Sequence, residues 1–383
     1  MALHFDESEF TARKNKVINA LNDRGLDGLL CFQQETMFYL TGFDTFGFCF
    51  FQCLYLGTDG TLALLTRSAD LRQAQHTSNI DDIRIWTDEG GAQPATQLRA
   101  MLEDLGVKGK KLGVEYDTVG LTAANGKAVD AALGGFCELE DTSRLVDLIR
   151  AVKSEAELAY VRRAGELADQ SLVDGLAVIK AGADEGDVLA AMQGAVFAGG
   201  GDYPGNEFII GSGHDALLCR YKTGRRVLSD DDQITLEWAG VYRHYHAAMM
   251  RTVVVGTLGA RHIKMFDAAQ EALLACENQM RPGKTAGDVF DAHAAVIEKH
   301  GMSDHRLNAC GYSLGATFTP SWMDKPMFYH NNPVELQPGM VMFAHMILMD
   351  SDSGTAMTLG RSYILGEGEP EKLSKLPLDL LTR

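Results

Sequence analysis

The chain of 383 residues has no long apolar run, and no stretch approaches the ~20 apolar residues that a membrane-spanning helix needs. It also lacks an excess of positive charge, because 35 Lys and Arg stand against 52 Asp and Glu, a formal net charge of −17. This charge would repel a phosphate backbone, so we expect no nucleic-acid partner and instead a small ligand or another protein. The lack of a long apolar run predicts no membrane partner. The start, MALHFDESEFTARK, has acidic residues where a secretory signal would have basic ones, which indicates a cytoplasmic protein.

Cysteines are few and scattered, and their odd number of seven does not suit a disulfide framework. Most lie in apolar segments such as LLCF, so we interpret them as reduced core thiols. Cys49 and Cys53 are four residues apart, but no second cysteine or histidine pair lies nearby to complete a zinc site. The segment AGGGDYPG at 198–205 lacks the Lys-Ser/Thr ending of a phosphate-binding loop. The sequence therefore predicts neither a structural zinc nor a nucleotide site.

The first ~145 residues alternate helical and strand patterns, as in an α/β layer. Helical spacing covers 7–26, 66–77 and 94–106, and strand-like runs cover 28–32, 50–57 and 110–116. Beyond residue 140 the spacing predicts one or two long helices, with a helix entry at 153–155. We therefore place one domain at 1–145 and a second at 146–383.

The second part combines helices with β-hairpins. Helices are expected at 185–197, 264–279 and 287–300, and hairpins at 233–256 and 339–366. Two such helix-plus-hairpin halves predict a duplicated α+β unit.

Glu237 is the first candidate for chemistry. Period-two alternation in ITLEWAGVY places it on one face with Thr235, opposite the apolar side chains. If the chain turns near 241–243, His246 faces Glu237 across the hairpin. A carboxylate in so apolar a run needs a partner or a raised pKa, and both conditions are associated with acid-base or nucleophilic work. The alternative is a surface pair on a half-exposed sheet.

Three further residues have both a structural and a functional interpretation. His345, in the apolar strand MVMFAHMILM, is a satisfied core histidine or a catalyst. Tyr312, in the glycine-containing ACGYSLG, presents an exposed phenol or is simply buried. Arg220 belongs either to a solvated basic face or to a cleft in which its planar fork holds a carboxylate. The basic residues near it are Lys222, Arg225 and Arg226.

Several segments together resemble the pita-bread family of methionine aminopeptidase, prolidase and creatinase, over nearly the whole chain. They are MFYLTGF, IRAVKSEAEL, DDQITLEWAG, MRTVVVG, RPGKTAGDV, GYSLG and LQPGMVM. The resemblance implies a creatinase-type α/β N-terminal domain followed by an α+β pita-bread catalytic domain. In the metallopeptidases of this family, two Asp, one His and two Glu hold two metal ions. The matching positions here are Glu237, Ala248, Tyr312, His345 and Leu359. Only the first keeps a carboxylate, so the resemblance implies the metal-free branch and no cofactor.

Within that branch the chain is similar to the ectoine hydrolases. The matching segments are LTGFDTFGFCFFQC, GGDYPG, EWAGVYRHYHAAMMRT and CGYSLGATFTPSW. Arg220 stands where those relatives and creatinase have a histidine, and Leu359 where they have a glutamate. These departures imply a pocket rebuilt around His345 and Arg220, with a substrate that need not be ectoine.

The resemblance implies a metal-independent hydrolase of a C–N bond in a small zwitterionic or cyclic-amidine compound. Glu237 would be the nucleophile or general base, His246 the proton shuttle, and Tyr312 the oxyanion donor. His345 completes the catalytic candidates, and Arg220 would hold a substrate carboxylate. The other substrate-binding candidates are Phe43, Asp44, Phe46, Phe48 and Tyr203.

The LTG segment, in creatinase-like dimers, caps the neighbour's pocket, so the resemblance also implies a homodimer. Three alternatives stay open. The protein could be a catalytically silent ligand-binding homologue, or a metal-dependent Xaa-Pro peptidase. An acid-base pocket without metal also suits elimination as well as hydrolysis.

Overall fold

The computed structural model describes residues 3–221, 223–224 and 226–383, so Lys222 and Arg225 of the basic cluster lie outside the described residues. The chain divides into two compact units, Met1–Arg150 and Ala151–Arg383. The division lies five residues beyond the boundary expected at residue 145. Across the described ranges, no helix is long and apolar enough to cross a membrane.

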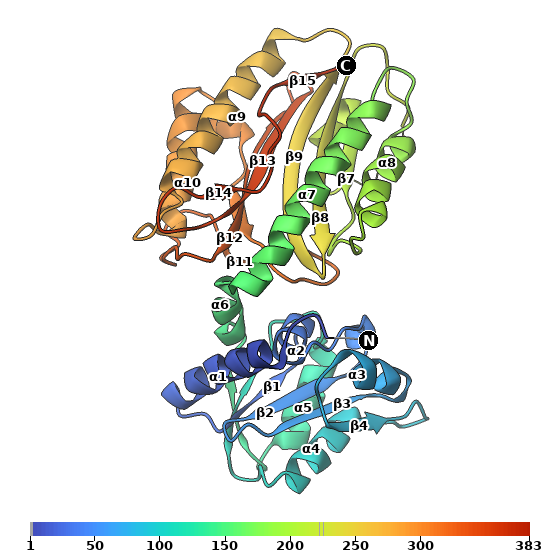
Figure 1. The fold of residues 1–383 in the computed structure, drawn as a ribbon, viewed down its shortest axis with the longest axis vertical. Coiled ribbons are helices and arrows are strands. Elements are labelled where there is room, and N and C mark those ends of the chain that lie inside the picture. Colours follow the sequence, from blue (N-terminus) through green and yellow to red (C-terminus); the bar gives the residue numbers. More distant parts are fainter. Residues whose placement is uncertain (1–2, 222, 225) are drawn as a thin grey trace. The chain divides into compact units, whose positions relative to one another are not determined.

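The first unit is a mixed β-sheet with helices on both faces (Figure 1). Its strands follow the order β4-β3-β2-β1-β5-β6, with β1 parallel to β5 and antiparallel to β2. One core lies against α1 through Val17 and Leu21, and the other lies against α4 and α5 through Leu98 and Val129. This arrangement confirms the α/β prediction. The elements are α1 Glu7–Asp23, β1 Gly28–Cys31, α2 Gln34–Thr41, β2 Cys53–Gly57, β3 Leu62–Arg67, α3 Leu71–Thr77, β4 Asp82–Trp86, α4 Pro94–Asp104, β5 Lys111–Val114, α5 Ala123–Leu133 and β6 Glu138–Asp141, with α6 Leu145–Ala151 at the junction.

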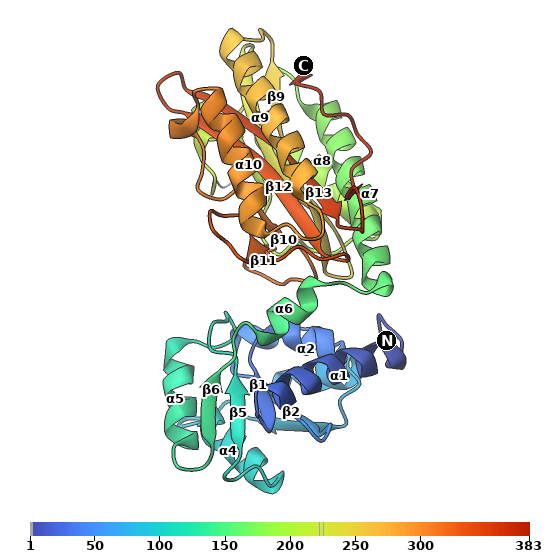
Figure 2. The ribbon, with the colours of Figure 1, turned by 90° about the vertical axis from the view of Figure 1, so that its left-hand side faces the viewer.

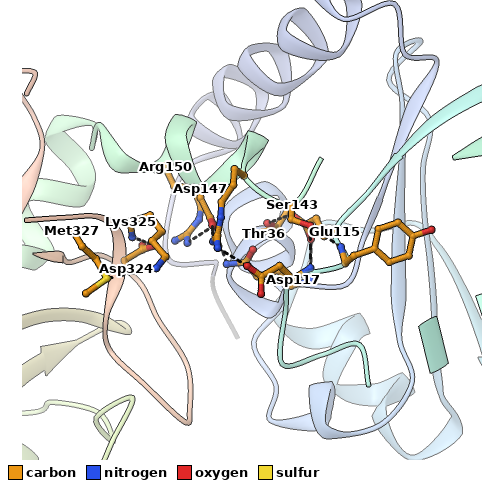
Figure 3. A network of polar contacts seen from close by, with 12 residues as sticks. Thr36, Glu115, Asp117, Ser143, Asp147, Arg150, Asp324, Lys325 and Met327 are labelled. Atoms are coloured by element: carbon orange, nitrogen blue, oxygen red, sulfur yellow. Dashed lines mark hydrogen bonds and ion pairs between the residues drawn. The ribbon is translucent and has the colours of Figure 1, made fainter. Parts of the chain in front are cut away.

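A buried carboxylate holds the start of α2 in this unit. Glu115 follows β5, and its carboxylate accepts hydrogen bonds from the hydroxyl of Thr36 and from the backbone N–H groups of Phe32 and Gln33 (Figure 3). Burial raises the pKa of Glu115 to about 8, although these three bonds act in the opposite direction. Asp147 adds a smaller raising effect. Glu115 therefore ties the end of one strand to the first turn of a helix.

The second unit contains a sheet whose strands lie antiparallel in the order β11-β10-β12-β13-β9-β8-β7, and β15 adds to β9 in parallel. Figure 2 shows α9 and α10 in front of β12 and β13. Helix α7 packs on the hairpin β8–β9 and against α8. Helix α9 packs on the hairpin β12–β13 and against α10. These two halves confirm the duplicated α+β prediction. The elements are α7 Glu155–Val178, α8 Glu185–Ala198, β7 Ile209–Ser212, β8 Asp232–Tyr242, β9 Tyr245–Val255, α9 Ala260–Gln279, α10 Ala286–Lys299, β10 Gly311–Ser313, β11 Asp324–Met327, β12 Val341–Asp350, β13 Thr355–Ile364, β14 Glu371–Lys372 and β15 Leu381–Thr382.

The turn of the first hairpin lies later in the chain than the sequence suggested. Arg243 and His244 have φ values of 52° and 64°, the left-handed pair that a two-residue turn between twisted strands requires. The register therefore pairs Glu237 with Met250, and Val241 with His246. The predicted pairing of Glu237 with His246 is wrong. Because the turn lies at Arg243 and His244, each residue of β8 pairs with a residue further along β9 than expected.

The register places one row of residues across four strands. Glu237 of β8 pairs with Met250 of β9, Met250 pairs with Gly360 of β13, and Gly360 pairs with His345 of β12. Leu359 instead pairs with Met346, and both belong to the core beneath α9 and α10. Since alternate residues point to opposite faces, Glu237 and His345 share the face that those helices leave uncovered.

Candidate active site

Glu237 lies in the middle of β8, where its carboxyl is only partly exposed. Burial raises its pKa to about 7, and the positive charge of Arg220 and a hydrogen bond from Tyr312 oppose that increase. Beside it is a small cavity of about 20 Å³, lined mainly by apolar side chains and by Thr235 and Thr358. Glu237 and Thr235 lie two residues apart in the continuous strand β8, which confirms that they share a face. A carboxyl with a pKa near 7 is present in both protonation states at neutral pH.

Tyr312 stands beside Glu237 on the same face of the sheet. It belongs to β10 and pairs with Phe343 of β12, two residues before His345. Its hydroxyl accepts a hydrogen bond of 2.9 Å from the indole N–H of Trp322 and donates one to Glu237. Burial and the charge of Glu237 raise the pKa of Tyr312 well above its ordinary value. Tyr312 is therefore a neutral hydrogen-bond donor at physiological pH.

Arg220 is exposed and lines an open cleft of about 670 Å³. The cleft reaches Ile209, which also borders the cavity beside Glu237 and pairs with Glu237 across β7 and β8. The guanidinium donates one hydrogen bond of 2.8 Å to the carbonyl of Cys219, and its charge acts on Glu237 and Tyr312. The other lining residues are Gln193, Tyr203, Pro204, Gly205, Asn206, Glu207, Tyr221, Thr319 and Pro320.

Tyr203 forms part of the rim of this cleft. Its side chain is 80% exposed, and its ring packs edge-on against Phe197 with the centroids 4.9 Å apart. The structure thus brings together Arg220 and Tyr203, two of the predicted substrate-binding residues, in one cleft.

His246 holds two loops of the cleft and does not reach Glu237. Its Nε2 accepts a hydrogen bond of 2.8 Å from the backbone N–H of Gly205, while Nδ1 lies 3.1 Å from the hydroxyl of Thr317. Because Nε2 is an acceptor, the proton of the neutral ring is on Nδ1. Burial lowers the pKa of His246 to about 3. With both nitrogens occupied, the ring is a structural tie between loops, and the geometry gives no support to the predicted proton shuttle.

His345 has a free nitrogen on the face that carries Glu237. Its ring centroid lies 5.5 Å from that of Tyr312 and 5.4 Å from that of Phe343. Burial, and then positive charge on His293 and Arg220, lowers its pKa to about 3, so the imidazole is neutral. Among the described residues, Nδ1 has no hydrogen-bond partner. An unpaired buried nitrogen is costly, which favours a ligand-directed role over a satisfied core histidine.

The aromatic candidates of the LTG segment differ in exposure. Phe43 is fully buried in the core of the first unit and Phe48 is 6% exposed, so neither presents a ring to a ligand there. Gly42, with φ of 78°, ends α2 in the left-handed conformation, after which Phe43 enters the core. Phe46 is 81% exposed, and the carboxyl of Asp44 lies 3.7 Å from Nε2 of His4. The prediction that Phe43 and Phe48 bind substrate is therefore not supported, because both side chains pack inside the first unit.

Trp322 and Cys219 belong to this site although sequence reasoning missed both. Trp322 is fully buried and bonds to Tyr312, and Cys219 borders the cavity of Glu237. The final Trp of CGYSLGATFTPSW was the only signal for the former, and nothing in the sequence singled out the latter.

The residues at the metal-ligand positions do not fit a dinuclear metal centre. The face of the sheet that carries Glu237 presents Ala248, Tyr312, His345 and Gly360. The predicted match of Leu359 to a ligand position is wrong. Leu359 points into the core beneath the helices, and Gly360 occupies the face that carries Glu237. Neither residue offers an oxygen ligand. In the described part of the chain, no group of three or more His, Cys, Asp or Glu side chains is placed to hold a metal ion.

Comparison with known proteins gives two matches to family models. Residues 159–363 match metallopeptidase family M24, and residues 13–152 match the creatinase/prolidase N-terminal domain. An ectoine hydrolase of Halomonas elongata is 27% identical over 404 aligned positions, which span 100% of this chain and 99% of that protein. A Xaa-Pro dipeptidase of Pyrococcus furiosus is 22% identical over 207 positions, covering 53% of this chain and 60% of that protein.

Solved structures share the fold of the whole chain. A prolidase from Thermococcus sibiricus superposes with a TM-score of 0.88 at 19% identity, covering 98% of this chain and 99% of that one. A dipeptidase from Pyrococcus horikoshii gives a TM-score of 0.84 at 22% identity, covering 97% and 100%. At these identities, the likeness establishes a creatinase-type domain followed by a pita-bread domain.

Proposed function

Since the chain belongs to metallopeptidase family M24 and is a hydrolase of the creatinase group, we propose that it cleaves a C–N bond in a small zwitterionic or cyclic-amidine compound without a metal ion. One observation carries this proposal. A partly buried carboxyl with a pKa near 7, Glu237, lies between a neutral donor, Tyr312, and a cationic residue of an open cleft, Arg220. These are the parts of an acid-base or nucleophilic site.

The substrate class follows from the charges at the cleft. Arg220 presents a planar cation to the cleft, which suits a carboxylate held by two parallel hydrogen bonds. The overlap with an ectoine hydrolase along the full chain supports a small zwitterion. The resemblance matches Arg220 to a histidine of the ectoine hydrolases, so the proposed substrate class includes guanidino acids and N-acyl amino acids besides ectoine-like rings.

The proposed reaction adds water across one C–N bond. In its ionised form, Glu237 would remove a proton from the water that attacks the electrophilic carbon. Alternatively it would attack that carbon itself, and water would then hydrolyse the covalent intermediate and release Glu237. In the free protein the single hydroxyl proton of Tyr312 is directed at the Glu237 carboxylate. Once Glu237 has taken up a proton or bound the carbon, Tyr312 would donate its hydrogen bond to the oxygen that gains negative charge. The C–N bond then breaks, and the leaving nitrogen takes up the proton that Glu237 received from water, or a proton from water itself where Glu237 is the nucleophile. The unpaired Nδ1 of His345 is proposed to hydrogen-bond to the substrate during this step. The poor metal-ligand set supports a reaction that uses these side chains alone.

The decisive experiment is a substrate screen with a matched inactive variant. Compatible solutes, guanidino acids and N-acyl amino acids are incubated with the wild type and with Glu237→Gln, and products are identified by mass. For a ring opening we expect one product that is heavier than the substrate by one water, about 18 Da, and for an open-chain substrate two fragments whose masses add up to the substrate plus one water. In Glu237→Gln we expect turnover to fall by at least ~10²-fold. Products whose masses add up to that of the substrate, with no water added, would indicate elimination. Binding without any turnover would favour a silent ligand-binding homologue, and unchanged activity of the variant would refute the role of Glu237.

A further inference from the structure

Trp322 joins the cleft to the row of residues around Glu237. It lies in the loop between β10 and β11, and its side chain is fully buried. Its backbone N–H donates a hydrogen bond of 3.2 Å to the side-chain oxygen of Asn206, a residue that lines the cleft. Its indole N–H donates the bond of 2.9 Å to the hydroxyl of Tyr312. One residue therefore contacts both the substrate side and the tyrosine beside the carboxyl.

The other two tryptophans make a different kind of bond. The indole N–H of Trp86 donates to the carbonyl of Phe51 at 2.8 Å, and that of Trp238 donates to the carbonyl of Ala168 at 3.0 Å. Both acceptors are backbone groups. Trp322 differs because its acceptor is a hydroxyl that also carries a proton.

This difference restricts where the proton of Tyr312 can point. An indole N–H is a donor only, whereas a phenol has one hydrogen and keeps it near the plane of its ring. The hydroxyl therefore has two orientations, and one of them would set its hydrogen against the hydrogen of Trp322. The remaining orientation directs the proton of Tyr312 at Glu237, in agreement with the hydrogen bond that Tyr312 donates.

We propose that Trp322 is a positioning residue, whose indole N–H fixes the orientation of the Tyr312 hydroxyl and keeps its proton directed at the Glu237 carboxyl. The inference rests on the proposed function only for its catalytic consequence, because the orientation itself exists in the free protein. With Trp322 in place, Tyr312 stabilises the ionised form of Glu237, which is the form able to attack or to accept a proton. The other charged group that acts on Glu237 is Arg220, and Glu237 in turn raises the pKa of Cys219.

The first test measures Glu237 without a substrate. Carboxyl titration is followed by infrared difference spectroscopy in the wild type, in Trp322→Phe and in Tyr312→Phe, with Glu237→Gln identifying the signal. We expect Trp322→Phe to raise the midpoint by about one pH unit, a tenfold change that corresponds to weakening one hydrogen bond to a charged group. Adding Trp322→Phe to Tyr312→Phe should have no further effect. Trp238→Phe, which removes an equivalent bond on the helix side of β8, should leave the midpoint unchanged.

A second measurement needs no substitution at Trp322. In ¹⁵N-labelled wild type, the indole N–H resonance of Trp322 should shift with the same midpoint as Glu237, while those of Trp86 and Trp238 should stay fixed. Once a substrate is known, Trp322→Phe should lower kcat about tenfold and change KM less than about threefold. The inference would be overturned if Trp322→Phe left the titration midpoint of Glu237 unchanged. It would also be overturned if the indole N–H resonance of Trp322 did not shift as Glu237 titrates. Failure of the proposed function would appear separately, as full activity in Glu237→Gln.

Discussion

Replacing Glu237 by Gln, which we expect to lower turnover, should also make the second unit more stable than that of the wild type, by a margin that grows as the pH rises. The pKa of Glu237 is about 7 in the folded protein against an ordinary value of 4.5. A raised folded-state pKa contributes stability that is fully present below pH 4.5 and is lost as the pH rises through 7. Above pH 7, the wild type therefore bears the cost of an ionised, partly buried carboxylate, which the amide of Gln avoids.

The size of this effect follows from the difference of about 2.5 between the two pKa values, which corresponds to an upper limit of about 3 kcal/mol. Glu237 keeps some solvent exposure, so we reduce this limit to about 1–2 kcal/mol. Part of the cost is already present at pH 6. Between pH 6 and pH 8.5, we therefore expect the free energy of unfolding of Glu237→Gln to gain about 1 kcal/mol relative to the wild type.

The assay is urea unfolding followed by circular dichroism at pH 6, 7 and 8.5, a range that stays above the isoelectric point of about 5.0. Thr235→Val is the matched control, because it removes a buried hydroxyl beside Glu237 on the same face but no ionisable group. Its difference from the wild type should not vary with pH. The histidines with lowered pKa values contribute equally to both proteins and cancel. A difference between Glu237→Gln and wild type that stays constant from pH 6 to 8.5 would refute the reasoning.

Three further predictions concern the metal, the assembly and the first unit. Purified protein should contain no stoichiometric Mn, Fe, Co or Zn, and EDTA should leave activity intact; about two metal ions per chain by elemental analysis would contradict this. The protein should sediment as a homodimer at micromolar concentration, because Phe46 and Phe50 are 81% and 41% exposed; an active monomer would be evidence against it. Glu115, with its raised pKa of about 8, should cause the stability of the first unit to fall as the pH rises through 8, a slope that Glu115→Gln should reduce in urea unfolding followed by Trp86 fluorescence.

The elements of the fold could be predicted from the sequence because their signals are local. Ser154 and Glu157 form the capping box that begins α7, next to the helix entry expected at 153–155. The hairpins β8–β9 and β12–β13 follow from alternating apolar residues. The face shared by Glu237 and Thr235 follows from the same two-residue period.

The register and the contacts across loops could not be predicted in this way. Arg243 and His244 form a left-handed turn, although neither is the Gly, Asn or Asp that usually marks one, so the pairing of Glu237 was misplaced. Leu359, which the resemblance matched to a metal-ligand position of the family, lies one residue from Gly360, which faces the site; a shift of one residue along a strand is enough to exchange the two faces of the sheet. Trp322 reaches Asn206 over 116 residues of sequence, a distance at which no local pattern is informative.

The tie made by His246 constrains how this protein can evolve. Gly205 and Thr317 belong to different loops, yet each depends on one nitrogen of the same imidazole. At Gly205 the backbone of Ser321 and Trp322 lies so close that a Cβ would stand 2.9 Å from its atoms. A substitution that moves one of these loops therefore breaks its hydrogen bond to His246 unless the imidazole moves as well. We therefore expect substitutions that reposition one loop to be accompanied by substitutions in the other, whereas the strands need not change.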